Sequence, residues 1–190
     1  MKAILGKKLG MTTIYDAEKG ALNVTMVECV PNIVSLLRRS EKDGYSAVQL
    51  EMPVTEKRTL KREFRTEKIE GMKEGDKVTV ESFSVGDKVK VSGITKAKGF
   101  QGVMKRHGFH GSPATHGHRH DHRAPGSIGS AFPEHVFKGK KMAGRTGGGQ
   151  MTVGTVVIVF VDKEKNLLAV KGAVPGVSGR SVAIFGSEKA

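Results

Sequence analysis

Four histidines occupy alternate positions in one short stretch of the chain, at His116, His118, His120 and His122. If this stretch is extended, alternate side chains lie on one face, roughly 6.5–7 Å apart along it. Two imidazoles on that face could contribute to one zinc ion, which each ring nitrogen binds at about 2.0–2.1 Å. Imidazoles also act in acid–base catalysis and bind anions. A metal site, a catalytic site and an anion-binding surface are therefore the three interpretations to weigh.

The metal interpretation lacks supporting ligands. No cysteine lies near the histidines, Asp121 would point to the opposite face, and Gly117 leaves the backbone loose. Arg119 and Arg123 would add positive charge beside a bound cation, whereas zinc sites need ligands held rigidly by further hydrogen bonds. We therefore predict no metal and no cofactor, and we favour polar contacts to an RNA backbone. A metal bound by the histidines is the alternative hypothesis.

A second stretch with chemical potential is the glycine-rich segment 144–150, GRTGGGQ. Its last three residues resemble the Gly-Gly-Gln of peptide-chain release factors, which promotes hydrolysis of a peptidyl ester. Gln150 runs directly into a predicted strand, however, and no Lys followed by Ser or Thr is present where a P-loop requires it. No paired base or nucleophile accompanies the segment, and no Ser-His-Asp set can be proposed. The sequence therefore predicts a protein that is not an enzyme.

The positive charge of the chain is concentrated around these stretches. The 190 residues carry a net charge of +13, and Lys96–Arg145 alone carries ten Lys and Arg against Asp121 and Glu134. This segment thus holds +8 of the total, together with all seven histidines. Such a balance predicts a polyanionic partner. Aromatic residues make up only 5% of the chain, so phosphates and RNA shape are more plausible targets than stacked bases.

Three further features narrow the class of protein. The longest apolar run, Val156–Val161, is far shorter than the ~20 residues of a membrane-spanning helix. The N-terminus does not resemble a signal peptide. The single cysteine, Cys29, excludes an internal disulfide and fits a reducing compartment. We therefore predict no membrane partner, no small-molecule substrate and a cytoplasmic location.

The elements that position these residues are predicted to be mainly β-strands. Short strands joined by turns are indicated over residues 1–52, 75–95 and 152–185, because β-branched runs alternate there with turn residues. The run Val156–Val161 predicts a strand that is buried on both faces. Many short strands with little helix indicate a small antiparallel barrel or sandwich.

The charged stretch 53–72 interrupts this pattern. Leu60, Phe64 and Ile69 are loosely at helical spacing, which predicts a short surface helix or an irregular insertion. The chain then divides into one β-barrel globular domain, residues 1–95 with 150–190, and an extended loop, residues 96–149. The loop has too few apolar residues to offset its ordering entropy. We expect it to become ordered only on a charged partner.

Five motifs occur in one order along the chain: GKKLGMT at 6–12, KGFQG at 98–102, RAPGSIG at 123–129, VFKGKKMAG at 136–144 and NLLAVKGAVPG at 166–176. Together they closely resemble the ribosomal protein L3 family of the large ribosomal subunit, in its bacterial form. The resemblance implies a closed, Greek-key-like, six-stranded barrel with a long internal extension that passes through 23S ribosomal RNA toward the peptidyl-transferase centre. It also implies direct RNA binding early in subunit assembly, no enzymatic activity, and contacts with the neighbouring proteins L14 and L19.

The chain departs from the family pattern at three places. Family members commonly carry uncharged residues where this chain has His118 and His120. Relatives often read KKMAGQMG, with a glutamine that can be methylated on its side-chain nitrogen. Arg145 takes that place here, so no modification is expected. The stretch 53–72 is shortened and diverged, and its contacts cannot be carried over.

The residues predicted to contact ribosomal RNA are cations, imidazoles and one hydroxyl, because these groups donate hydrogen bonds to phosphate and sugar oxygens. They are Lys7, Lys8, Lys96, Lys98, Lys105, Arg106, His107, His116, His118, Arg119, His120, His122, Arg123, Ser127, Lys138, Lys140, Lys141 and Arg145. Glycines among them let the backbone fit narrow RNA grooves. The competing functions are a zinc-dependent or release-factor-like hydrolase and a free-standing nucleic-acid chaperone.

Overall fold

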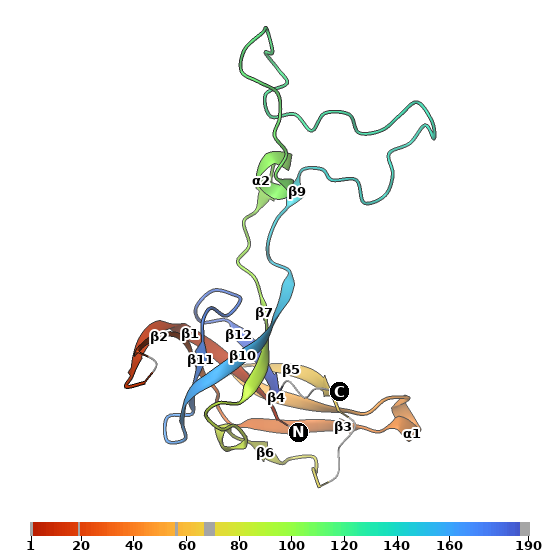
Figure 1. The fold of residues 1–190 in the computed structure, drawn as a ribbon. Helices are drawn as coiled ribbons and strands as arrows, with labels where there is room; N and C mark the ends of the chain where they lie inside the picture. The colour runs from red at the N-terminus through yellow and green to blue at the C-terminus, as the bar shows by residue number, and fades with distance from the viewer. Residues whose placement is uncertain (1, 19, 56, 67–70, 187–190) are drawn as a thin grey trace. The chain divides into compact units, whose positions relative to one another are not determined.

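The computed structural model describes residues 2–18, 20–55, 57–66 and 71–186 (Figure 1). The described residues are mainly β-strand, which confirms the predicted class. Their helices are single turns, α1 (Ser40–Asp43), α2 (Val103–His107) and the 3-10 turn η1 (Val80–Ser82). Within this part of the chain no helix has the length and apolarity needed to cross a membrane. The chain divides into two compact units, Met1–Thr95 with Gln150–Ala190, and Lys96–Gly149.

Six strands of the first unit pair in a closed ring (Figure 1). In ring order they are β1 (Ala3–Asp16), β12 (Ser181–Gly186), β7 (Lys88–Ile94), β10 (Gln150–Asp162), β11 (Leu167–Lys171) and β2 (Gly20–Glu28). All neighbours are antiparallel. Closure leaves no free edge on this sheet.

The barrel interior is apolar because alternate residues of each strand point inward. Val182 and Ile184 of β12, like Val89 of β7, are at most 2% exposed. Strand β10 alternates as well, since Val156 and Ile158 are buried whereas Val157 and Val159 between and after them are only half-buried. The prediction that this strand is buried on both faces is therefore wrong, because the outer surface of the barrel is only partly covered.

A second sheet packs against the barrel within the first unit. Its order is β5 (Arg58–Arg65), β4 (Ala47–Thr55), β3 (Asn32–Arg38) and β6 (Lys77–Val78). Val48 and Leu50 pack with Leu5 of β1 in a shared apolar cluster. The buried Asn32 connects the two sheets, because its amide Nδ2 donates to the carbonyl of Leu5 at 3.1 Å and its Oδ1 accepts from the Leu5 N–H at 2.6 Å. This buried polar side chain is fully satisfied, as such groups usually are.

The predicted helix or irregular insertion over 53–72 is wrong for the residues that the structure describes there. Residues 58–65 form strand β5, which pairs with β4. A spacing of four residues places Leu60 and Phe64 on one face of a helix, but it does so equally in a strand, where every second residue shares a face. Ile69, the third residue of the predicted pattern, lies outside the described residues.

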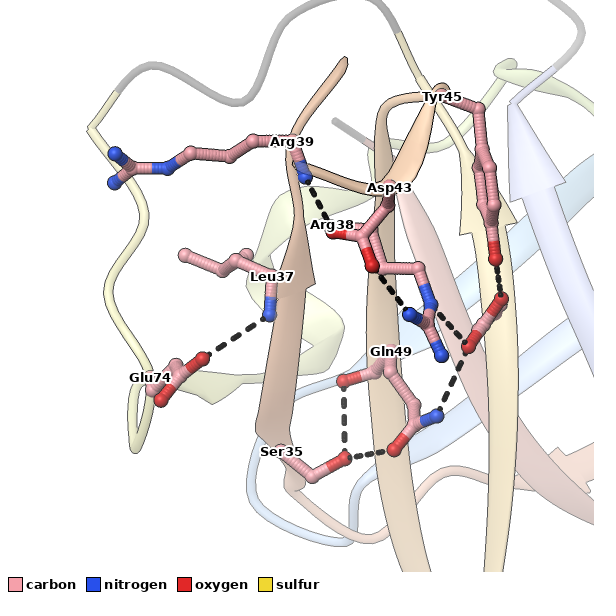
Figure 2. Close-up of polar contacts among 9 residues, drawn as sticks. Ser35, Leu37, Arg38, Arg39, Asp43, Tyr45, Gln49 and Glu74 are labelled. Carbon is pink, nitrogen blue, oxygen red and sulfur yellow. Dashed lines mark hydrogen bonds and ion pairs between the residues drawn. The ribbon is translucent and has the colours of Figure 1, made fainter. Parts of the chain in front are cut away.

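Charged side chains on this sheet are paired with one another (Figure 2). Arg38 Nε lies 3.0 Å from a Glu63 oxygen, and its Nη1 lies 2.6 Å from Asp43. The hydroxyl of Tyr45 donates to the other Glu63 oxygen at 2.9 Å, and Gln49 donates to the first at 3.1 Å. The hydrogen bonds from Arg38 are the largest cause that lowers the pKa of both Glu63 and Asp43.

The second unit has almost no core. Strand β8 (Phe100–Gln101) pairs antiparallel with β9 (Gly144–Arg145). Val103 of α2 is the one buried side chain of residues 96–149, all of which the structure describes. Its neighbours are exposed or half-buried, so apolar burial contributes little to the order of this unit.

Candidate nucleic-acid interface

The cations of the second unit are exposed and unneutralised. They are Lys96, Lys98, Lys105, Arg106, Arg119, Arg123, Lys138, Lys140, Lys141 and Arg145. None lies within ion-pair distance of a carboxylate in the described part of the chain. In the first unit, by contrast, Lys2 pairs with Asp87 at 2.7 Å and Lys61 with Glu51 at 3.1 Å. Unpaired cations keep their Coulomb attraction available for a partner of opposite charge.

The two ends of the basic segment are held together by its backbone. Beyond the β8–β9 pairing, the N–H of Lys98 donates to the carbonyl of Thr146, and the N–H of Thr146 donates to the carbonyl of Gly99, each at 2.9 Å. Gly147 closes this base, because a side chain there would overlap the carbonyl of Lys96. The intervening cations are thus carried on a closed loop.

Two side chains of α2 hold the returning chain. Arg106 Nη1 donates to the carbonyl of Met142 at 2.8 Å, and His107 Nε2 lies 3.0 Å from the same oxygen. Gly144 lies beside them, and a Cβ there would displace the Arg106 guanidinium from its present position. Arg106 and His107, both predicted RNA contacts, therefore also position Lys138–Lys141. A guanidinium has five N–H donors, so Arg106 retains donors for a phosphate.

The histidines do not form the extended face considered from the sequence. His116 and Gly117 both have positive φ, 61° and 76°, so the chain turns there. His122 Nε2 contacts the carbonyl of His118, and His118 Nδ1 lies 3.9 Å from Asp121. Asp121 therefore shares a side with His118, contrary to expectation. Ser127 is exposed and donates to the carbonyl of Gly129 at 2.9 Å.

No group of three or more His, Cys, Asp or Glu side chains in the described ranges is arranged to hold a metal ion. We expect protein purified without an affinity tag to contain no stoichiometric zinc, because zinc sites usually gather four ligands in fixed geometry. Elemental analysis of the full chain measures this. The prediction fails if one zinc per chain is found and is lost when His118 and His120 are replaced by Asn, but not when His107 is.

Lys7 and Lys8 differ, although they are adjacent in β1. Lys7 is exposed. Lys8 is only 8% exposed, and its ammonium donates to the carbonyls of Val174 and Gly176 at 2.7 and 3.0 Å. Lys8 therefore fixes the loop between β11 and β12, and we remove it from the proposed RNA contacts.

Gln150, the last residue of the release-factor-like motif, is part of the barrel. It is the first residue of β10, pairs with Ile94, and donates through Nε2 to the hydroxyl of Ser92 at 3.1 Å. The sulfur of Cys29 is fully buried, and this burial raises the pKa of its thiol. The contacts of Gln150 and the burial of Cys29 therefore indicate that both residues contribute to the fold of the barrel.

A folded β-rich unit in which some cations form ion pairs, joined to a loop whose ten cations form none with a described carboxylate, is suited to binding a polyanion. Comparison with known proteins agrees. Residues 47–170 match the model of the family described as Ribosomal protein L3. The chain is 44% identical over 208 residues to the Bacillus cytotoxicus large ribosomal subunit protein uL3, with 100% of this chain and 98% of the relative covered. The Bacillus mycoides protein of the same name is 45% identical over 207 residues, with 99% and 98% covered. The chain therefore belongs to the ribosomal protein L3 family.

Proposed function

We propose that this protein is a structural constituent of the large ribosomal subunit that binds 23S ribosomal RNA directly through residues 96–149. In this proposal it supports early subunit assembly in the cytoplasm, and its basic loop extends toward the peptidyl-transferase centre. It has no catalytic role, and L14 and L19 are its neighbours. The observation that carries the proposal is the set of ten exposed cations without carboxylate partners in the described residues.

The chemistry of the loop fits an RNA backbone. Lys and Arg bind phosphate through charge-assisted hydrogen bonds, and imidazoles and the Ser127 hydroxyl can bind phosphate or the ribose 2′-OH. The residues that we propose to contact the RNA are those predicted from the sequence, with Lys8 left out. A loop with one buried side chain gains its missing interactions from the surface against which it lies, which supports ordering on RNA.

Association with the large subunit tests the proposal. The full chain should be recovered at one copy per large subunit. We define a loop variant, with Lys138, Lys140 and Lys141 replaced by Gln, and a control variant with the same substitutions at Lys73, Lys77 and Lys165, exposed lysines of the first unit. The loop variant should be depleted from subunits and the control variant retained. Recovery mainly outside ribosomal particles would favour a free-standing chaperone instead.

Arg145 should act on assembly rather than on folding. Its side chain is exposed, and its backbone pairs with Phe100. We expect Arg145→Ala to change the unfolding free energy by no more than about 0.5 kcal/mol, as for most surface substitutions. Large-subunit assembly or translation should be impaired, and Arg58→Ala, at another exposed arginine, should leave both normal. A large decrease in the melting temperature of isolated Arg145→Ala protein would contradict this role.

A further inference from the structure

A groove of about 1450 Å³ lies in the first unit between strand β5 and the outer surface of the barrel. Its apolar lining includes Leu60, Phe64 and Ala183, and the ring of Phe185 lies tilted against that of Phe64, with 6.1 Å between the ring centroids. The barrel side is formed by residues of β7 and β12. The groove therefore has an apolar floor formed by side chains of β5 and β12.

One wall of the groove is a free sheet edge. Strand β5 ends the order of the second sheet, and among the residues that the structure describes it pairs only with β4. The N–H of Thr66 donates to the carbonyl of Ser46, next to the pair Ala47 and Arg65. Hydrogen-bonded and non-hydrogen-bonded pairs alternate along an antiparallel ladder, so the bond between Thr66 and Ser46 makes Ala47 and Arg65 a non-hydrogen-bonded pair. Every second residue of β5, counted from Arg65, therefore directs its N–H and C=O groups away from β4. The free edge thus carries the backbone groups of Lys61, Glu63 and Arg65.

The groove also has a surplus of positive charge. The two carboxylates among its described lining residues are already engaged, Glu63 with Arg38 and Asp87 with Lys2. Arg62, Arg65 and Lys88 line it and form no ion pair with a described carboxylate. The ring of Tyr45 lies 5.1 Å from the Arg65 guanidinium and holds that cation in place, as aromatic faces do.

We propose that this groove binds an extended, acidic segment of another protein, which adds a strand to the free edge of β5. Main-chain hydrogen bonds to a sheet edge supply affinity in this mode, and alternate side chains supply specificity. One set of side chains would lie over Ala183 and Phe185 and include carboxylates that face Arg62 and Lys88. The other set would face Arg65, because Arg62 and Arg65 lie on opposite faces of β5. A peptide is favoured over RNA, because alternating backbone donors and an apolar floor match a polypeptide. This proposal does not depend on RNA binding by residues 96–149.

Binding of a fluorescein-labelled nine-residue peptide with the repeating pattern Val-Val-Glu-Glu to the full chain tests this, because that pattern places both residue types on each face of an extended strand. Lys88→Glu should weaken binding by roughly tenfold or more, since like charges across an interface are strongly unfavourable. Lys165→Glu is the matched control, because Lys165 is exposed in the turn between β10 and β11 and does not line the groove. It should leave the affinity within about twofold, as expected for screened distant charges. Equal loss in both variants, or no binding of the peptide, would overturn the proposal.

The backbone hydrogen bonds need a separate test. Lys61→Pro removes an N–H from the free edge and spares the pairing with β4, a position that proline tolerates on an edge strand. It should abolish peptide binding, whereas Lys61→Thr, which loses the same charge, should not. N-methylation of the peptide tests the same bonds without changing the protein. Of two peptides, one methylated at the odd-numbered and one at the even-numbered backbone nitrogens, one should fail to bind.

Two other occupants would overturn the proposal. One is RNA. It would be indicated if a nine-nucleotide single strand bound to the protein more tightly than the peptide does and if Lys88→Glu abolished that binding. The other is a second copy of this chain. It would be indicated if the peptide did not bind and if sedimentation showed self-association that Lys61→Pro abolished.

Discussion

The affinity of the full chain for a 23S ribosomal RNA fragment should fall roughly 10³–10⁵-fold between 50 and 200 mM salt. This range applies if the basic loop neutralises about 6–10 phosphates, because each contact releases condensed counterions whose entropy depends on salt. Ten exposed cations without described carboxylate partners are available for these contacts. A binding titration across this salt range measures the effect.

The loop and control variants decide which cations are responsible. Each loses three positive charges, so both change the net charge equally. The loop variant should reduce the slope of log affinity against log salt by about 2–3, since each phosphate contact contributes ~0.7–0.9. The control variant should leave the slope nearly unchanged. Equal slopes for wild type and loop variant, or a flat salt response, would show that these lysines do not bind the RNA.

Amides of the barrel should exchange on the order of 10³-fold or more slowly than those of the loop in the free protein. Core strands open only with global unfolding, which requires roughly 5–15 kcal/mol, whereas weakly packed loops open at almost no cost. Val156–Val170 spans two barrel strands. Gly99–Gly149 contains one buried side chain, a single helical turn and a two-residue strand pair, and such short helices are marginal on their own.

Hydrogen exchange followed by mass spectrometry measures this difference, and RNA-bound protein is the control. Protection across Gly99–Gly149 should rise on binding a 23S ribosomal RNA fragment, while that of Val156–Val170 should hardly change. Equal protection of both regions in free protein would show that the loop has a stable core of its own.

The charge of the loop could be predicted from the sequence, but the pairing of each cation could not. Nothing in the printed chain distinguishes Arg38 from Arg119, since each is an arginine with a basic residue beside it. Arg38 is paired with Glu63, a residue brought to it by the β4–β5 hairpin, whereas Arg119 has no such pair among the described residues. Lys8 resembles Lys7 in the same way, yet its ammonium is buried against carbonyls of a loop more than 160 positions away. Ion pairs and burial depend on tertiary contacts that a local pattern does not contain.

Local patterns also left two conformations undecided. The spacing of Leu60 and Phe64 fits a helix and a strand equally, and pairing with β4 selects the strand. The alternation of the histidines predicts a shared face only in an extended chain, and the positive φ of His116 removes that condition. The groove beside β5 could not be predicted from the sequence, because a free sheet edge cannot be inferred where the pattern does not indicate a strand.

Ultraviolet cross-linking of purified large ribosomal subunits, followed by identification of the cross-linked residues, tests the central claim most directly. We predict that the chain is present in these subunits and that its cross-links to 23S ribosomal RNA fall mainly within residues 96–149, around Arg119, Arg123 and Lys138–Arg145. Cross-links confined to the first unit, with residues 96–149 free of RNA, would contradict it.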